Sequence, residues 1–210
     1  MARARVPLTR STLLETQRSL SFAQEGYNLL DRKREILLSE LTAETPGAEQ
    51  ARDALISDST EAYGALAGAR MAVGVDSVRR VAMGTRGESQ LEIRERSIVG
   101  AVVPEIRCAL PERRPGYSLI SATAEVDAAV IAFAQLTRTI CRAAETEIAV
   151  VRLATEIRKT QRRVNALRNV VIPRQESIIK EVREALEDAE REAFFQLKRL
   201  RAQREKRAAR

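Results

Sequence analysis

The sequence predicts a mainly α-helical protein, built as a long antiparallel coiled coil of two helices with a small β-hairpin in the middle of the chain. Of its 210 residues, 44% are hydrophobic but only 3% are aromatic and 31% are charged, which leaves little material for a thick core. Nine Gly and six Pro leave long stretches filled with good helix formers. We therefore expect a helix over 1–82, a hairpin region over 83–116 and a second helix over 117–210.

The first helix is expected to begin between Leu8 and Leu13, because Thr12 and Glu15 have the spacing of a capping box. Apolar residues then recur at alternating steps of three and four, which is typical of a coiled-coil seam. The predicted seam positions of this helix are Leu13, Leu20, Tyr27, Leu30, Leu37 and Leu41. Pro46 lies within a helix-forming stretch, so we expect a kink near 45–47 and not a loop.

The middle region changes character, because β-branched residues become frequent and Gly100 offers a turn. This pattern predicts a hairpin, with the strand that contains Pro104 at an edge. Two isolated strands are only marginally stable in water. The hairpin is therefore expected to pack against the helices or against a partner.

The second helix shows the same spacing as the first. Its predicted seam positions are Val130, Ile140, Val151, Val164, Leu167 and Ile178. From Leu167 onward the apolar residues also recur every eleven positions, which locally straightens a supercoil. Pro173 has no N–H to donate, so we expect it to bend or loosen one helical turn.

The net charge is +7, and it is concentrated in residues 152–210, which alone carry +8. Such a basic end can serve as a solvated face, as a surface for a protein partner or as a salt-dependent grip on nucleic acid. No aromatic stacking motif or zinc-finger motif accompanies the charge. Composition alone therefore leaves a nucleic-acid-binding coiled coil and a scaffold protein open as alternatives.

Nothing in the sequence predicts catalysis, a cofactor or a metal site. There is no His, and Cys108 and Cys141 are far apart in the sequence, so we expect free thiols, with Cys141 a small core residue. Residues 84–89 resemble a phosphate loop but lack its Gly-Lys-Ser/Thr. The longest apolar run, Ala128 to Ala134, is far too short to span a membrane.

Three segments carry a family resemblance: 162–167 with the sequence RRVNAL, 170–173 with VVIP, and 190–198 with EREAFFQLK. In their order and spacing they closely resemble the D subunit of the V-type and archaeal-type rotary ATPases. The N-terminal end agrees, with Pro7, Leu8, Thr9 and Arg10 followed by Gly26.

This resemblance implies a central-stalk rotor protein whose paired terminal helices enter the hollow of a catalytic hexamer. The chain would be non-catalytic, and its rotation would couple ATP hydrolysis or synthesis to ion translocation by a membrane ring. The implied partners are the catalytic A and B subunits, the small F subunit of the central stalk and the C subunit that adapts the stalk to the ring, with no direct binding of nucleic acid. The implied location is peripheral, on the cytoplasmic side of the membrane and attached only through the complex.

In such an assembly, exposed basic residues of the rotor would contact the stator. The candidate stator contacts are Arg162, Arg163, Lys198, Arg199, Arg201 and Arg204.

Overall fold

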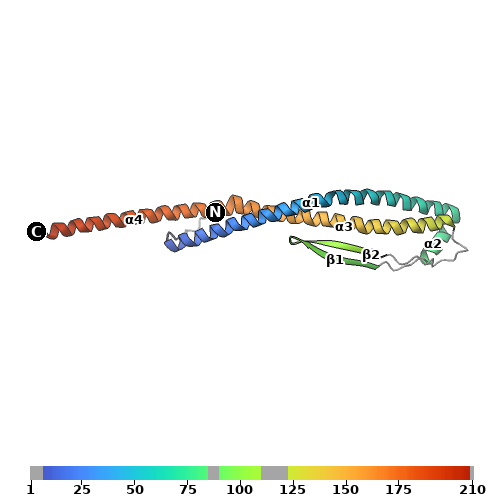
Figure 1. Cartoon of the computed structure of the whole chain (residues 1–210), viewed down its shortest axis with the longest axis horizontal. Helices are drawn as coiled ribbons and strands as arrows, with labels where there is room; N and C mark the ends of the chain where they lie inside the picture. Colours follow the sequence, from blue (N-terminus) through green and yellow to red (C-terminus); the bar gives the residue numbers. More distant parts are fainter. Residues whose placement is uncertain (1–6, 85–89, 110–122, 209–210) are drawn as a thin grey trace. The chain divides into compact units, whose positions relative to one another are not determined.

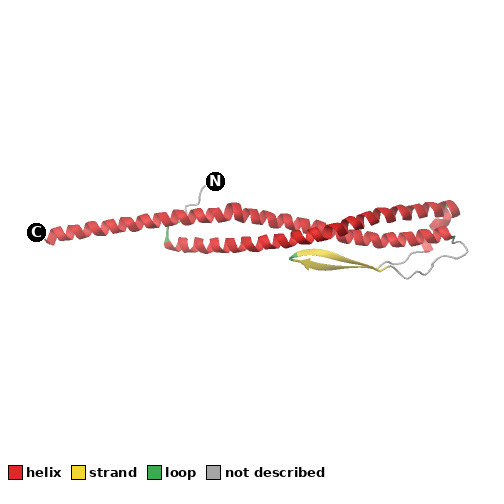
Figure 2. Cartoon of the chain, turned by 45° about the horizontal axis from the view of Figure 1, so that its top comes forward, coloured by secondary structure: helices red, strands yellow, loops and turns green. Residues whose placement is uncertain are grey.

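The computed structural model describes residues 7–84, 90–109 and 123–208 (Figure 1). In chain order its elements are α1 (Arg10–Val73), α2 (Val75–Gly84), β1 (Gln90–Ile98), β2 (Ala101–Ala109), α3 (Ala124–Ala166), the π-helical segment η2 (Leu167–Val171) and α4 (Ile172–Ala208). The predicted fold class is confirmed: a long N-terminal helix packs with a long C-terminal helix, and the two strands between them form a hairpin (Figure 2).

Two compact units divide the chain, one within residues 1–34 and 159–210 and the other within 35–158. The helices α1 and α3 each contribute to both units. In the second unit, Asp58 of α1 meets Thr139 of α3, and the ring of Tyr63 packs edge-on against that of Phe133 at 5.6 Å between centroids. Residue numbers therefore rise along α1 as those of the contacting residues fall along α3. The two helices are antiparallel.

The start of α1 lies where the sequence predicts it, but Thr9 is the residue that caps it. The Thr9 hydroxyl accepts a hydrogen bond from the Thr12 backbone N–H at 3.2 Å, and the Thr9 carbonyl accepts one from Leu13 at 3.0 Å. Thr12 is therefore inside the helix, three residues after the cap. The predicted box at Thr12 and Glu15 lies one turn too late.

The predicted N-terminal helix segment consists of two helices in the structure. The first helix, α1, continues through Pro46 without interruption. Just before this proline, the hydroxyl of Thr45 donates a hydrogen bond to the carbonyl oxygen of Leu41 at 2.7 Å. Helix α1 ends at Val73, before the predicted boundary at 82, because Gly74 adopts a left-handed φ of 81°. The chain then restarts as the short helix α2.

The predicted hairpin is confirmed. Strands β1 and β2 pair antiparallel with Ile98 opposite Ala101, so a two-residue turn of Val99 and Gly100 joins them. Both turn residues have positive φ, 49° for Val99 and 82° for Gly100, which suits the right-handed twist of a hairpin. Glycine adopts such a φ freely, whereas a β-branched residue does so only with strain.

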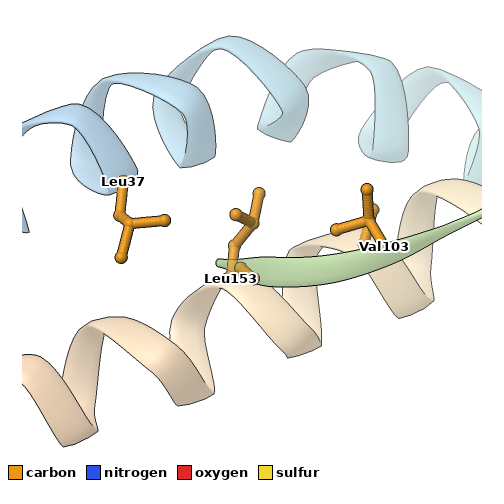
Figure 3. Close-up of a cluster of buried hydrophobic side chains, with 5 residues drawn as sticks. Leu37, Val103 and Leu153 are labelled. Atoms are coloured by element: carbon orange, nitrogen blue, oxygen red, sulfur yellow. The ribbon is translucent and has the colours of Figure 1, made fainter. Parts of the chain in front are cut away.

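The hairpin packs on the helices of the second unit, as expected from its small size. A buried cluster joins Leu37 of α1, Leu153 of α3 and Val103 of β2 (Figure 3), together with Ala101 and Ala149. Arg152 Nη1 donates a hydrogen bond to Val102 O at 3.0 Å, and Arg96 forms an ion pair with Glu44 at 3.5 Å. A second cluster packs Val81 of α2 against Ala69, Val126 and Ala129.

The transition from α3 to α4 is a π-helical turn. The backbone N–H of Ile172 donates to Leu167 O, five residues earlier, directly before Pro173. In an α-helix the Pro173 ring would clash with the carbonyl of Asn169 and would leave that carbonyl without a donor. A wider turn relieves this conflict, so the expectation that Pro173 loosens one turn is confirmed.

Candidate functional site

In the first unit, the N-terminal part of α1 lies antiparallel to the end of α3 and to α4. Arg10 forms an ion pair with Glu190, and Arg34 Nη1 donates to Gln161 Oε1 at 3.2 Å. The buried residues of this unit are Thr16, Ala23, Thr160, Val164 and Val182. Apart from the two valines they are small or hydroxylated, so the helix backbones can approach each other closely.

The predicted seam residues differ in their burial. Leu37 and Val164 are buried. The half-buried members are Leu13, Leu20, Tyr27, Leu30, Leu41, Val130, Leu167 and Ile178. Ile140 and Val151 are 49% and 57% exposed, so neither lies in the contact between α1 and α3.

The predicted register of α3 is wrong at these two positions. The buried residues of this helix in the second unit are Val126, Ala129, Leu136, Thr139, Ala143, Ala149 and Leu153. Thr139 is buried in place of the neighbouring Ile140, and Ala149 lies two positions before Val151. The prediction followed the β-branched Ile140 and Val151, whereas the packing buries the smaller Thr139 and Ala149 close to them.

The candidate basic contacts form two separate groups. Arg162 and Arg163 are exposed on α3, and the four residues Lys198, Arg199, Arg201 and Arg204 are exposed on α4. The 35 residues from Arg163 to Lys198 correspond to roughly 50 Å of helix. The structure therefore does not bring the two groups together into one site.

The last part of α4 exposes apolar side chains as well as basic ones, which the distribution of charge in the sequence does not predict. Phe194 and Phe195 are 67% and 68% exposed, and Leu197 and Leu200 are exposed as well. Figure 2 shows α4 continuing past the beginning of α1, which agrees with the ion pair between Arg10 and Glu190. The sequence carries no local signal for this uncovered stretch, because the offset between the two helix ends results from their packing.

The exposed apolar and basic residues surround this part of α4. At about 100° per residue, Phe194, Phe195 and Leu200 point in three different directions around the helix. Lys198 and Arg199, which lie between Phe195 and Leu200 in the sequence, also point about 100° apart. We call residues 194–204 of α4 the bare segment. It presents mixed apolar and basic contacts on all sides.

The rest of the described chain offers no enclosed catalytic site. Its best-formed hollows are two open grooves between α1 and α4, lined by Leu20 and Ile179 in one and by Leu13 and Leu186 in the other, with charged residues at both. Among the described residues, no three His, Cys, Asp or Glu side chains gather as metal ligands would. None of the described helices combines the length and apolarity that crossing a membrane requires.

Comparison with known proteins identifies the family. The family of the ATP synthase D subunit matches residues 12–202. This chain belongs to the ATP synthase D subunit family. The match covers most of the helical pair of the first unit, the hairpin and nearly all of the bare segment. The resemblance to the D subunit is therefore confirmed, and it extends well beyond the three short motifs found in the sequence.

Several curated relatives align with nearly the full length of this chain. The V-type ATP synthase D subunit of Thermotoga neapolitana is 37% identical over 91% of this chain and 95% of its own. The A-type ATP synthase D subunit of Pyrococcus furiosus is 37% identical over 94% of each chain. That of Pyrococcus abyssi is 38% identical over 92% of each.

Proposed function

We propose that this chain is the central-stalk rotor shaft of a V/A-type ATPase or ATP synthase. It couples ATP hydrolysis or synthesis in a catalytic hexamer to ion translocation by a membrane ring. The observation that carries the proposal is the bare segment, which presents apolar and basic side chains around its whole circumference. A helix that binds one partner face needs a single stripe, whereas a helix enclosed by a ring of subunits contacts them on every side.

Family membership supports the same assignment, since the relatives are named as subunits of V-type and A-type ATP synthases. In this proposal the A and B subunits perform the chemistry and surround the bare segment. The small F subunit of the stalk and the C subunit that adapts the stalk to the ring bind elsewhere on the chain. The chain itself is non-catalytic and is peripheral, on the cytoplasmic side of the membrane, attached only through the complex.

The basic side chains suit a contact that must slide as well as hold. Lys198, Arg199, Arg201 and Arg204 are long and exposed, so their charges can follow acidic or carbonyl-lined surfaces as the shaft turns. Exposed ion pairs are individually weak, on the order of 1 kcal/mol or less. Many weak contacts retain a shaft without locking it in one position. Arg162 and Arg163 form a second, separate set of proposed stator contacts.

The test is retention of the shaft in an assembled complex of the A and B subunits. Truncation after Gln196 and the charge reversal of Lys198 and Arg199 to Glu should both weaken retention, and the defect of the reversal variant should depend on salt. Reversal of Arg79 and Arg80 on α2 to Glu is the control with equal charge change. Retention and ATP turnover equal to wild type in the truncated chain, across the salt series, would contradict the proposal.

The apolar part of the contact is tested separately. Phe194→Ser and Phe195→Ser remove exposed side chains, so they should leave the isolated chain as stable as wild type. They should nevertheless lower shaft retention in the complex at all salt concentrations, because an apolar contact is not screened. Unchanged retention in the double variant would show that the bare segment is not enclosed.

A further inference from the structure

Two free thiols lie on elements that pack against each other in the second unit. Cys108 is the penultimate residue of β2, and Cys141 lies on α3. Both side chains are half-buried. Thirty-two residues separate them in sequence, so only the packing of the hairpin on the helix can bring them together.

The contact between Val102 and Arg152 sets the alignment of β2 on α3. From this contact, β2 runs toward the N-terminal end of α3 (Figure 1). Six strand residues lead from Val102 to Cys108, roughly 20 Å. Eleven helical residues lead back from Arg152 to Cys141, roughly 17 Å. The two cysteines therefore lie at the same level along the helix.

The burial pattern of β2 shows that Cys108 faces inward. Near the turn, Ala101 and Val103 are buried while Val102 is exposed, but at the far end Cys108 is half-buried between the exposed Arg107 and Ala109. The inward side thus changes from odd to even positions at Val103 and Pro104, which are both buried. The twist of the strand explains such a change.

The electrostatics of the thiols agree with this placement. Burial raises the pKa of the Cys141 thiol, and a hydrogen bond with Cys108 raises it further. This influence of Cys108 agrees with the placement of both thiols at the same level of the interface between hairpin and helix. A disulfide requires the two Cα atoms to lie within about 7 Å of each other, so a link between the thiols directly tests this placement.

We propose that Cys108 and Cys141 form a redox-responsive pair, which a peroxide oxidises to a disulfide that fastens the far end of the hairpin to α3. One thiol reduces the peroxide and becomes a sulfenic acid, with release of water. The other thiol attacks that sulfur, and a second water leaves as the S–S bond forms. Two thiols and one hydrogen peroxide thus give one disulfide and two waters.

The disulfide would change how the hairpin is held. In the reduced chain the hydrogen bond from Arg152 and the ion pair of Arg96 with Glu44 lie in the half of the hairpin nearest its turn. The pair at Cys108 and Cys141 adds a covalent tie at the opposite end. The inference does not depend on the proposed rotor function, because it concerns contacts within this chain.

The experiment treats the purified full chain with hydrogen peroxide and analyses its non-reduced peptides by mass spectrometry. We expect an intramolecular link between Cys108 and Cys141 that dithiothreitol reverses. Amide hydrogen exchange in β1 and β2 should slow at least about fivefold on oxidation and recover on reduction. Cys108→Ser and Cys141→Ser should each abolish both effects.

A matched control moves the thiol by one residue. The double variant Arg107→Cys with Cys108→Ser keeps one cysteine on the same strand but places it on the exposed side. It should form the link to Cys141 at least about tenfold more slowly than wild type. Equal rates in the two proteins, links only between separate chains, or oxidation to sulfinic acid without a link would overturn the proposal.

Discussion

Asp58 of α1 accepts a hydrogen bond from the hydroxyl of Thr139 on α3, with 2.6 Å between Asp58 Oδ2 and Thr139 Oγ1. Thr139 is buried, and the same hydroxyl lies 3.3 Å from Gln135 O. The pair places a polar anchor in the second unit, among contacts that are mostly apolar. It fixes which turn of α1 meets which turn of α3.

Thr139→Val should therefore lower the free energy of unfolding by about 1–3 kcal/mol, since it removes a hydrogen bond to a carboxylate. Urea denaturation measures this change. Thr155→Val is the control, because the Thr155 hydroxyl bonds to Val151 O on its own helix and is exposed. It should change the free energy by less than about 0.5 kcal/mol. Equal effects of the two substitutions would show that Asp58 does not couple the helices.

The second prediction concerns which residues of α3 are buried. Ala143 is buried, whereas Ile140 is 49% exposed three residues earlier. Ala143→Asp should cost about 3 kcal/mol or more, because it buries an unpaired carboxylate. Ile140→Asp should cost less than about 1 kcal/mol. Thermal unfolding followed by circular dichroism compares them, and the reverse order would restore the register predicted from the sequence.

The third prediction concerns the turn of the hairpin. Val99 has a φ of 49°, which is strained for a β-branched residue, and Gly100 follows it with a φ of 82°. Val99→Asn should stabilise the hairpin by about 1 kcal/mol, because asparagine tolerates this conformation and Asn-Gly favours such a turn. Hydrogen exchange of the β1 and β2 amides should slow about fivefold. Gly100→Ala is the opposite control and should accelerate it, and faster exchange in the Asn variant would contradict the turn geometry.

The Cys141 thiol makes a prediction about pH. Its pKa is raised in the folded chain, first by burial and then by Cys108, above the ordinary value of about 8.5 that it has when unfolded. The folded chain therefore holds the proton more tightly. The resulting stabilisation is complete below about pH 8.5 and is lost as the pH rises through the folded pKa.

Iodoacetamide labelling of Cys141 across a pH series measures this pKa directly. Cys108→Ala should move the midpoint of labelling to lower pH, because it removes the hydrogen bond from Cys108. The midpoint should remain above that of the urea-unfolded chain, since burial is the larger cause. A midpoint equal in wild type and variant would show that the two thiols do not interact.

The long helices, the hairpin and the loosened turn before Pro173 could all be predicted from the sequence, because each depends on local chemistry. Apolar spacing sets helical faces, Gly100 permits the turn, and a proline ring removes a donor wherever the helix runs. The family motifs are equally local, since they are short runs of residues whose order can be compared directly.

The residues of α3 that face α1, and the level of Cys108 relative to Cys141, become known only from the packing of the segments. Adjacent positions such as Thr139 and Ile140 both fit a coiled-coil spacing, and the close approach of α1 selects the smaller one. The cysteine pair depends on the alignment and twist of β2 over more than five residues. The bare segment depends on where α1 begins relative to α4. Each of these results from packing between segments distant in sequence, which no local pattern encodes.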